Sequence, residues 1–221
     1  MTHRSAAAIS SLLIAAMLAG SLWTLVRLPA DARVPVHFGF DGAGDAWMAP
    51  WPGLFFLPAA AAVVWVLFLV LPHIDPRGDN LIQSSKAYGT IWLGLIALLA
   101  AVHGVMLAAA FYIDIGVSRW VTVLTGALFV VMGNVLGKVR PNYTLGVRTL
   151  WTLADPHVWD KTHRFAGWLF VIGGLVLMIA AAAMPIGPML SGTLIVVVVS
   201  VTFLSIAKSY ALWRGRNRGR A

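Results

Sequence analysis

Six long apolar runs, separated by polar or turn-forming segments, dominate the pattern along the chain. They cover residues 6–26, 53–71, 88–113, 120–137, 165–183 and 190–213. Each approaches the roughly 20 residues that an α-helix needs to cross about 30 Å of hydrocarbon, whereas a transmembrane β-barrel has shorter segments of alternating polarity. The pattern therefore predicts an all-α membrane protein with six transmembrane helices, forming a single membrane domain over residues 1–221.

The first run raises the question of a signal peptide, because it follows a short segment that contains Arg4. Its apolar stretch continues to Val26, which is longer than a typical signal-peptide core. We therefore expect a retained helix.

Composition agrees with this prediction. The 221 residues are 60% hydrophobic and only 11% charged, with a mean hydropathy of +0.85. A formal charge of +8 could suggest nucleic acid binding, but most basic residues flank the apolar runs, as juxtamembrane anchors do. We therefore expect contact with membrane lipid and no direct contact with nucleic acid. The absence of Cys excludes disulfides, haem attachment and thiolate metal sites.

The distribution of basic residues predicts the orientation. With the N-terminus inside, thirteen of the sixteen lie on the inner side: Arg4, Arg77, Lys86, Lys138, Arg140, Arg148, Lys161, Arg164, Lys208, Arg214, Arg216, Arg218 and Arg220. The outer side holds Arg27, Arg33 and Arg119. The positive-inside rule then places both termini in the cytoplasm, in a multi-pass protein of the cytoplasmic membrane. Aromatic belts are expected from Trp23, Trp47, Trp51 and Trp120 at the outer helix ends and from Trp92, Trp168 and Trp213 at the inner ones.

The outer loop, residues 27–52, is rich in proline and glycine and is expected to be compact. Pro35 favours an extended backbone before it, so residues 34–38 should be extended. His37, Asp41 and Asp45 could ligate a divalent ion, but they lack the ligand number of a calcium loop, so we expect no metal. The simpler interpretation is that the aspartates cap turns while the loop's aromatic residues rest on the membrane surface.

The inner loop, residues 138–164, should contain the start of a helix. Asp155 followed by Pro156 is an N-cap followed by a first-turn proline. Helical spacing then places Trp159 and His163 on one face and predicts an ion pair between Asp160 and Arg164. Just before the loop, Gly133 and Gly137 form a small-xxx-small pair that favours close helix packing.

These residues closely resemble the signature of the SdpI family of bacterial immunity proteins. The signature comprises Gly133-Asn134, Gly137-Lys138, Arg140-Pro141-Asn142, Gly146, Arg148-Thr149, Trp151-Thr152-Leu153, Asp155-Pro156, Trp159, Lys161-Thr162-His163-Arg164 and Gly167. The outer Pro35, His37, Gly42, Asp45 and Trp47 are similar to the domain of unknown function that usually begins family members. The chain departs from the pattern at Gly39, where Asn is common, and at Leu150, where Pro is usual.

The resemblance implies a membrane protein that protects its cell from a secreted peptide toxin of the Sdp type. It also implies a soluble winged-helix repressor as a partner, held at the membrane when toxin is present. Candidate residues in the inner region are Asn134, Lys138, Arg140, Asn142, Arg148, Trp151, Asp155, Trp159, Lys161, His163 and Arg164, and in the outer loop Pro35, His37, Gly42, Asp45 and Trp47.

Other classes of protein fit the same pattern. A small-solute transporter needs polar groups near the bilayer midplane, where His103 is the strongest candidate and Asn134 lies nearer the inner end. A lone histidine within a helix is more often a packing residue. An envelope-stress role also fits. A membrane enzyme would have to use Asp155, His157, Asp160 and His163, which match no known catalytic spacing, so we expect neither an enzyme nor a cofactor.

Overall fold

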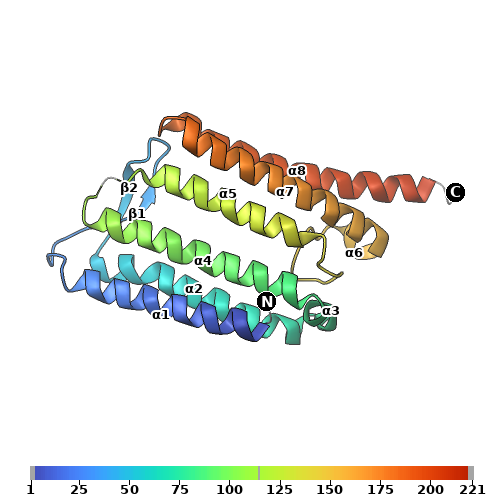
Figure 1. Ribbon diagram of the computed structural model, residues 1–221, viewed down its shortest axis with the longest axis horizontal. Coiled ribbons are helices and arrows are strands. Elements are labelled where there is room, and N and C mark those ends of the chain that lie inside the picture. Colours follow the sequence, from blue (N-terminus) through green and yellow to red (C-terminus); the bar gives the residue numbers. More distant parts are fainter. Residues whose placement is uncertain (1–2, 114, 219–221) are drawn as a thin grey trace.

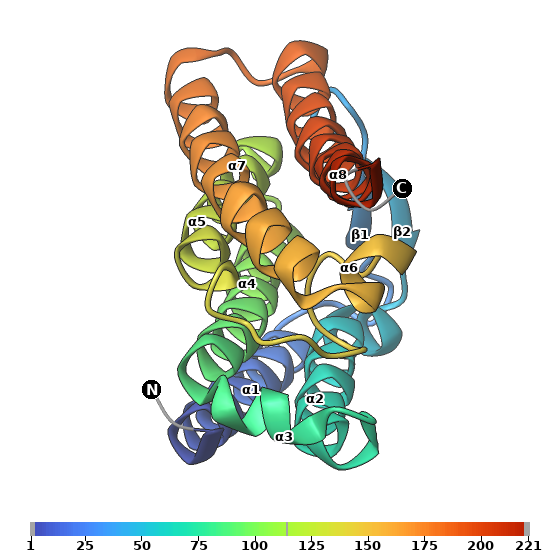
Figure 2. The same ribbon diagram turned by 90° about the vertical axis from the view of Figure 1, so that its right-hand side faces the viewer.

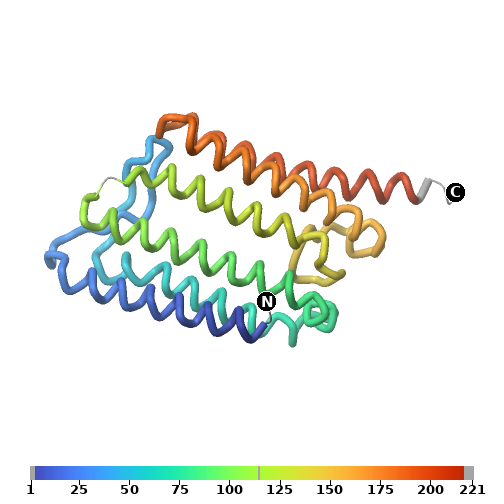
Figure 3. Tube along the Cα trace, in the orientation of Figure 1, coloured from blue at the N-terminus to red at the C-terminus, as the bar shows by residue number. Residues whose placement is uncertain are grey.

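The computed structural model describes residues 3–113 and 115–218. Long helices run side by side along one axis (Figure 1, Figure 3): α1 (His3–Leu25), α2 (Pro50–Ile74), α4 (Ser85–Ala110), α5 (Val117–Leu136), α7 (Pro156–Ala183) and α8 (Pro188–Arg218). All six are long and apolar enough to cross a membrane, which confirms the predicted fold class. The side of the membrane on which each end lies stays a prediction, and Arg220, which was counted toward it, lies outside the described residues.

Short elements join the long helices at both ends of the bundle. A hairpin of β1 (Val34–Phe38) and β2 (Gly44–Met48) lies at the end called outer here. The helices α3 (Gly78–Gln83) and α6 (Leu150–Ala154) lie at the opposite, inner end. The helix α8 has 31 residues, so at 1.5 Å per residue it is about 46 Å long and exceeds the hydrocarbon thickness. It extends beyond the other helices at the inner end (Figure 1).

The helices form two groups that share one contact (Figure 2). In the first group, α1, α2 and α4 pack on one another, and in the second, α7 packs on α5 and α8. The two central helices, α4 and α5, join the groups. This arrangement leaves α8 in contact mainly with α7.

Glycines set the closest approach in the fold, between α5 and α7. A Cβ added at Gly133 would lie 2.6 Å from the carbonyl oxygen of Gly167, and one added at Gly167 would lie 2.7 Å from that of Gly133. Gly126 and Gly174 face each other in the same way, at 2.7 and 2.4 Å. The expected close packing at Gly133 is therefore observed, because helices this close leave no space for a side chain between their backbones.

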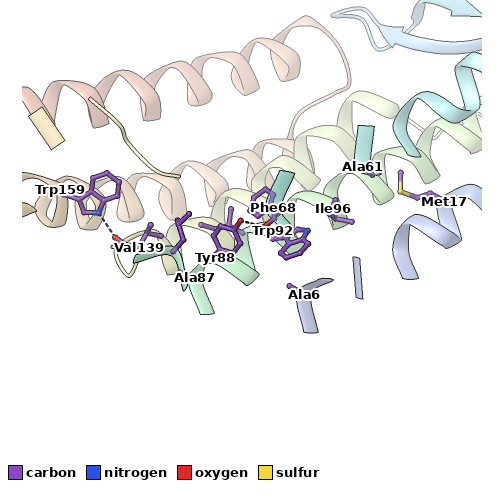
Figure 4. Packing of buried hydrophobic residues seen from close by; sticks show 12 residues of the cluster. Ala6, Met17, Ala61, Phe68, Ala87, Tyr88, Trp92, Ile96, Val139 and Trp159 are labelled. Atoms are coloured by element: carbon purple, nitrogen blue, oxygen red, sulfur yellow. Dashed lines mark hydrogen bonds between the residues drawn. The ribbon is translucent and has the colours of Figure 1, made fainter. Parts of the chain in front are cut away.

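A cluster of aromatic residues fills the inner half of the first group (Figure 4). Phe68 on α2 packs against Tyr88 and Trp92 on α4, and the Tyr88 hydroxyl donates to the Phe68 carbonyl at 2.6 Å. Trp92 is 1% exposed, so the prediction that it belongs to an interfacial belt is wrong. It faces inward because its side of α4 packs against α2. Trp168, by contrast, is 71% exposed and remains available to the interface.

Candidate functional site

The inner loop is attached to the ends of α2, α3 and α4 by its backbone. The carboxylate of Asp75, at the C-terminal end of α2, accepts the Tyr143 N–H at 2.9 Å and the Arg77 N–H at 2.7 Å. Asn80 donates its side-chain amide to the Pro141 carbonyl at 2.7 Å. These bonds satisfy loop backbone groups that would otherwise be unpaired next to the membrane.

One further bond of this kind joins Ser84 to the loop, because the Ser84 hydroxyl accepts the Arg140 N–H at 3.0 Å. The Arg140 guanidinium also donates to the side-chain oxygen of Gln83. None of the residues that receive the loop on this side belongs to the family signature. Sequence reasoning missed them because only the tertiary fold brings residues 75–84 beside residues 140–143.

Asn142 shapes the turn of the loop from within. It is fully buried, and its side-chain oxygen accepts the N–H groups of Thr144 at 2.9 Å and Leu145 at 2.6 Å. Its side-chain amide donates to the Arg140 carbonyl at 2.8 Å. An asparagine suits this position because it offers an acceptor and two donors on a short side chain.

His163 holds the next part of the loop. Its Nε2 accepts the Val147 N–H at 3.0 Å, and its Nδ1 lies 2.9 Å from the Trp159 carbonyl. Because a backbone N–H can only donate, Nε2 carries the lone pair, and Nδ1 carries the proton that the carbonyl accepts. The geometry thus specifies a neutral imidazole in a single tautomer. Gly146 comes just before this bond with φ of +114°, and a Cβ there would lie 2.3 Å from His163 Nε2.

Trp159 supports the same imidazole. The two residues lie on one helix face, as their spacing of four predicted, and their rings stack with centroids 4.0 Å apart and planes within 19°. The indole Nε1 donates to the Val139 carbonyl at 2.8 Å, which fixes the start of the loop (Figure 4). Trp159 and His163 are both fully buried, so they face the interior of the loop.

The end of the loop is joined to α8. Thr149 caps α6 through a reciprocal capping box with Thr152, and its hydroxyl lies 3.0 Å from that of Ser209. Asp155 caps α7 as predicted, accepting the His157 N–H at 2.8 Å, and its other oxygen pairs with Arg216 at 2.9 Å. The unusual Leu150 stands at the first position of α6, where a proline would also be accepted, so this departure leaves the helix start intact.

The outward-facing part of the inner region is basic. Lys138, Arg140, Arg148, Lys161 and Arg164 are exposed. The Arg148 guanidinium donates to the Tyr143 carbonyl at 2.8 Å. The predicted ion pair between Asp160 and Arg164 is wrong, since the ion pairs among the described residues are Asp155–Arg216 and His37–Asp45. The Arg164 side chain instead packs beside Gly137. A Cβ added at Gly137 would lie 3.2 Å from Cγ of Arg164.

Leu150 and Trp151 differ in their surroundings. Leu150 is 82% exposed on the inner loop, whereas the Trp151 ring has its centroid 5.0 Å from that of Tyr210 on α8. An apolar cavity of about 320 Å³ lies between the loop and the helices, lined in part by Gly146, Arg148 and Ser205. The candidate residues therefore fall into buried ones that hold the loop and exposed ones that surround it.

The outer loop forms a compact hairpin, as expected. Residues 34–38 form β1, and Pro35 pairs with Trp47 across the strands. Asp41 caps the turn by accepting the Ala43 N–H at 3.0 Å. Sequence reasoning missed β2, because its Gly44 and Asp45 are poor strand formers.

His37 and Asp45 meet on the exposed face of this hairpin, with Nδ1 and Oδ1 2.5 Å apart. No group of three or more possible metal ligands gathers anywhere in the described part of the chain. A cavity of about 460 Å³ lies between the hairpin, α5 and α8, lined by both His37 and Asp45 and by Ser118, Thr122 and Leu194. The turn is held beside α5, where a Cβ at Gly42, whose φ is +83°, would lie 2.9 Å from the Ser118 hydroxyl.

His103 has a structural environment within the membrane bundle. It is 2% exposed, and its Nε2 lies 2.9 Å from the Ser21 hydroxyl and 3.3 Å from the Leu54 carbonyl. The imidazole therefore connects α1, α2 and α4. Asn134 is exposed on α5 and donates to the Val130 carbonyl of its own helix at 2.7 Å.

Comparison with known proteins confirms the family resemblance. Residues 138–209 match the SdpI/YfhL protein family, and residues 12–62 match a domain of unknown function, DUF1648. The immunity protein SdpI of Bacillus subtilis (strain 168) is 30% identical over 95 residues, which cover 43% of this chain and 45% of that protein. The chain thus matches less than half the length of this relative. No solved structure matches.

Proposed function

We propose that this chain, a membrane protein related to the SdpI family, protects its cell against a secreted peptide toxin of the Sdp type and does so without cleaving it. The supporting observation is the match of the inner region, residues 138–209, to the SdpI/YfhL protein family. A relative named as an immunity protein points the same way. The cell is bacterial, and the chain resides in its cytoplasmic membrane with both termini inside.

The contacts of the inner loop favour protection by binding over catalysis. A hydrolase at this site would draw on Asp155 or His163 as acid or base. Asp155 is occupied as a helix cap and in an ion pair, and both ring nitrogens of His163 are bonded to backbone groups. These residues act on the shape of the loop.

Protection is tested in cells that are sensitive to an Sdp-type toxin. Expression of the chain should increase survival, and the toxin recovered from protected cultures should be intact by mass spectrometry. Toxin fragments that appear only with the wild-type chain would contradict protection by binding. Unchanged survival, at confirmed membrane abundance, would reject the immunity function itself.

The outer cavity is the proposed contact site for the toxin. It is large enough for one or two side chains, and it combines apolar walls with the exposed His37–Asp45 pair. Leu194→Trp narrows this cavity and should reduce protection. Val199→Trp adds the same bulk on α8 at a residue that is 58% exposed outside the cavity, so protection should stay at the wild-type level. Equal protection by both variants would place the toxin elsewhere.

The exposed side of the inner loop is the proposed contact site for a soluble repressor. Arg148 and Leu150 lie there, one as a charged donor and one as an exposed apolar group. Arg148→Lys retains a charge that can donate one bond to a carbonyl but loses the planar fork of the guanidinium. If this surface recognises a partner, Arg148→Ala and Arg148→Lys should both leave membrane abundance unchanged and reduce derepression of a reporter. Full signalling in both variants would reject Arg148, and low abundance in both would assign it to folding.

A further inference from the structure

A groove at the inner ends of α5 and α7 is separate from both loop cavities. It has a volume of about 450 Å³ and is lined by Gly133, Asn134, Gly137, Lys138, Arg164 and Trp168, among others. Gly133 and Gly137 bring α5 and α7 together at this place, so part of the groove wall is helix backbone.

Two cations line this groove, and no acidic side chain of the described residues lines it beside them. Lys138 and Arg164 are exposed, and neither side chain makes a hydrogen bond or ion pair with another described residue. The Arg164 side chain begins beside the backbone of Gly137, the residue before Lys138, so both cations start from the same end of the groove. Two adjacent unpaired cations raise the local concentration of anions.

The surroundings indicate that the anion belongs to a lipid. Trp168, four residues after Arg164, is 71% exposed, as expected for a tryptophan at the boundary of the hydrocarbon. Beyond it, the face of α5 and α7 is apolar and exposed, with Val131 at 40%, Ile172 at 54% and Leu175 at 47%. A headgroup held by the cations would therefore have its acyl chains against an apolar surface.

We propose that this groove binds one anionic phospholipid. The Lys138 ammonium and the Arg164 guanidinium contact its phosphate, the ring of Trp168 lies against its glycerol region, and its acyl chains follow the exposed face of α5 and α7. Basic pockets between transmembrane helices on the cytoplasmic side are known sites for such headgroups. The lipid would also cover the inner end of the glycine contact between α5 and α7.

The experiment counts lipids on the intact protein. The full chain is purified in detergent, mixed with phosphatidylglycerol or phosphatidylcholine, and examined by native mass spectrometry. We expect one tightly retained phosphatidylglycerol and no equivalent retention of phosphatidylcholine. Lys138→Gln and Arg164→Gln should each weaken retention by about fivefold, and the double variant should lose it. Lys138→Arg combined with Arg164→Lys keeps both cations and should restore most of it.

A charge-matched control separates this site from the general basic character of the inner end. Lys86→Gln combined with Lys161→Gln removes two exposed lysines that do not line the groove, and retention should stay at the wild-type level. Equal loss in this control, or wild-type retention in both single groove variants, would overturn the proposal. Displacement of the lipid by millimolar glycerol phosphate would assign the site to a soluble phosphate and would also overturn it.

Discussion

Replacing Gly146 with alanine tests whether the contact between the inner loop and His163 determines the shape of the loop. The added Cβ would lie 2.3 Å from His163 Nε2, the atom that accepts the Val147 N–H. The backbone at this residue also has φ of +114°, which L side chains rarely adopt. The substitution therefore strains the backbone and breaks a partly buried hydrogen bond at once.

The two costs can be added to an order of magnitude. Backbone strain of this kind costs about 1–3 kcal/mol, and a partly buried donor left unsatisfied costs up to about 1–3 kcal/mol more. A total of roughly 2–6 kcal/mol corresponds to an increase of about 30-fold to tens of thousands-fold in local opening of the loop. The effect should be local, because the helices on either side keep their own contacts.

Hydrogen exchange measured by mass spectrometry on the purified protein provides the assay. Peptides covering residues 142–149 should exchange faster in Gly146→Ala by at least about 30-fold, while peptides from α4 should be unchanged. Gly104→Ala is the matched control, because a Cβ there meets nothing within 4 Å. Exchange of the loop within threefold of wild type in Gly146→Ala would refute the role assigned to this contact.

Three further predictions concern packing, capping and orientation. Gly133→Leu forces a side chain against a backbone carbonyl of α7 and should lower the free energy of unfolding in detergent by about 3 kcal/mol or more. Gly104→Leu, where an added Cβ meets nothing within 4 Å, should not lower it. Equal effects of the two variants would show that α5 and α7 can separate freely. Asp155→Asn keeps a capping acceptor but loses the partly exposed ion pair, so it should cost less than about 1 kcal/mol, while Asp155→Ala should cost about 1 kcal/mol more. Identical unfolding of the two variants would show that the cap at Asp155 does not stabilise the protein. In a chain without native cysteine, an impermeant thiol reagent should label Ala43→Cys and not Leu150→Cys in intact cells, and the reverse labelling would overturn the orientation.

Sequence reasoning predicted the helices well because the bilayer imposes a single requirement on all of them. A run of about 20 apolar residues has few alternatives in hydrocarbon, where every backbone group must be bonded within its own segment. The cap at Asp155 and the shared helix face of Trp159 and His163 were predicted for a related reason, since both depend on residues within one helix. The order and spacing of residues along one helix are enough to predict such local features.

Contacts between distant segments were beyond the same reasoning. The bond from Asp75 to Tyr143 joins residues 68 positions apart, and that from Thr149 to Ser209 joins residues 60 apart. Helical periodicity also failed to show which face of α4 is buried, because nearly every side of that helix is apolar, and Trp92 was therefore assigned to the interface. In a membrane, lipid and protein interior are equally apolar, so hydrophobicity does not distinguish them.

The family resemblance bears differently on the buried and on the exposed residues of the inner loop. Asn142, Gly146, Trp159 and His163 belong to the matched signature, and all four act on the backbone of the loop itself. Their presence therefore argues that the shape of the loop is shared with relatives. The partner is a separate matter, because a soluble protein would meet exposed groups such as Arg148, and a shared fold does not by itself fix function. Variants of the buried residues should thus change exchange in the loop and, under the proposed function, protection as well, whereas a variant that reduces only the proposed signalling should lie on the exposed side.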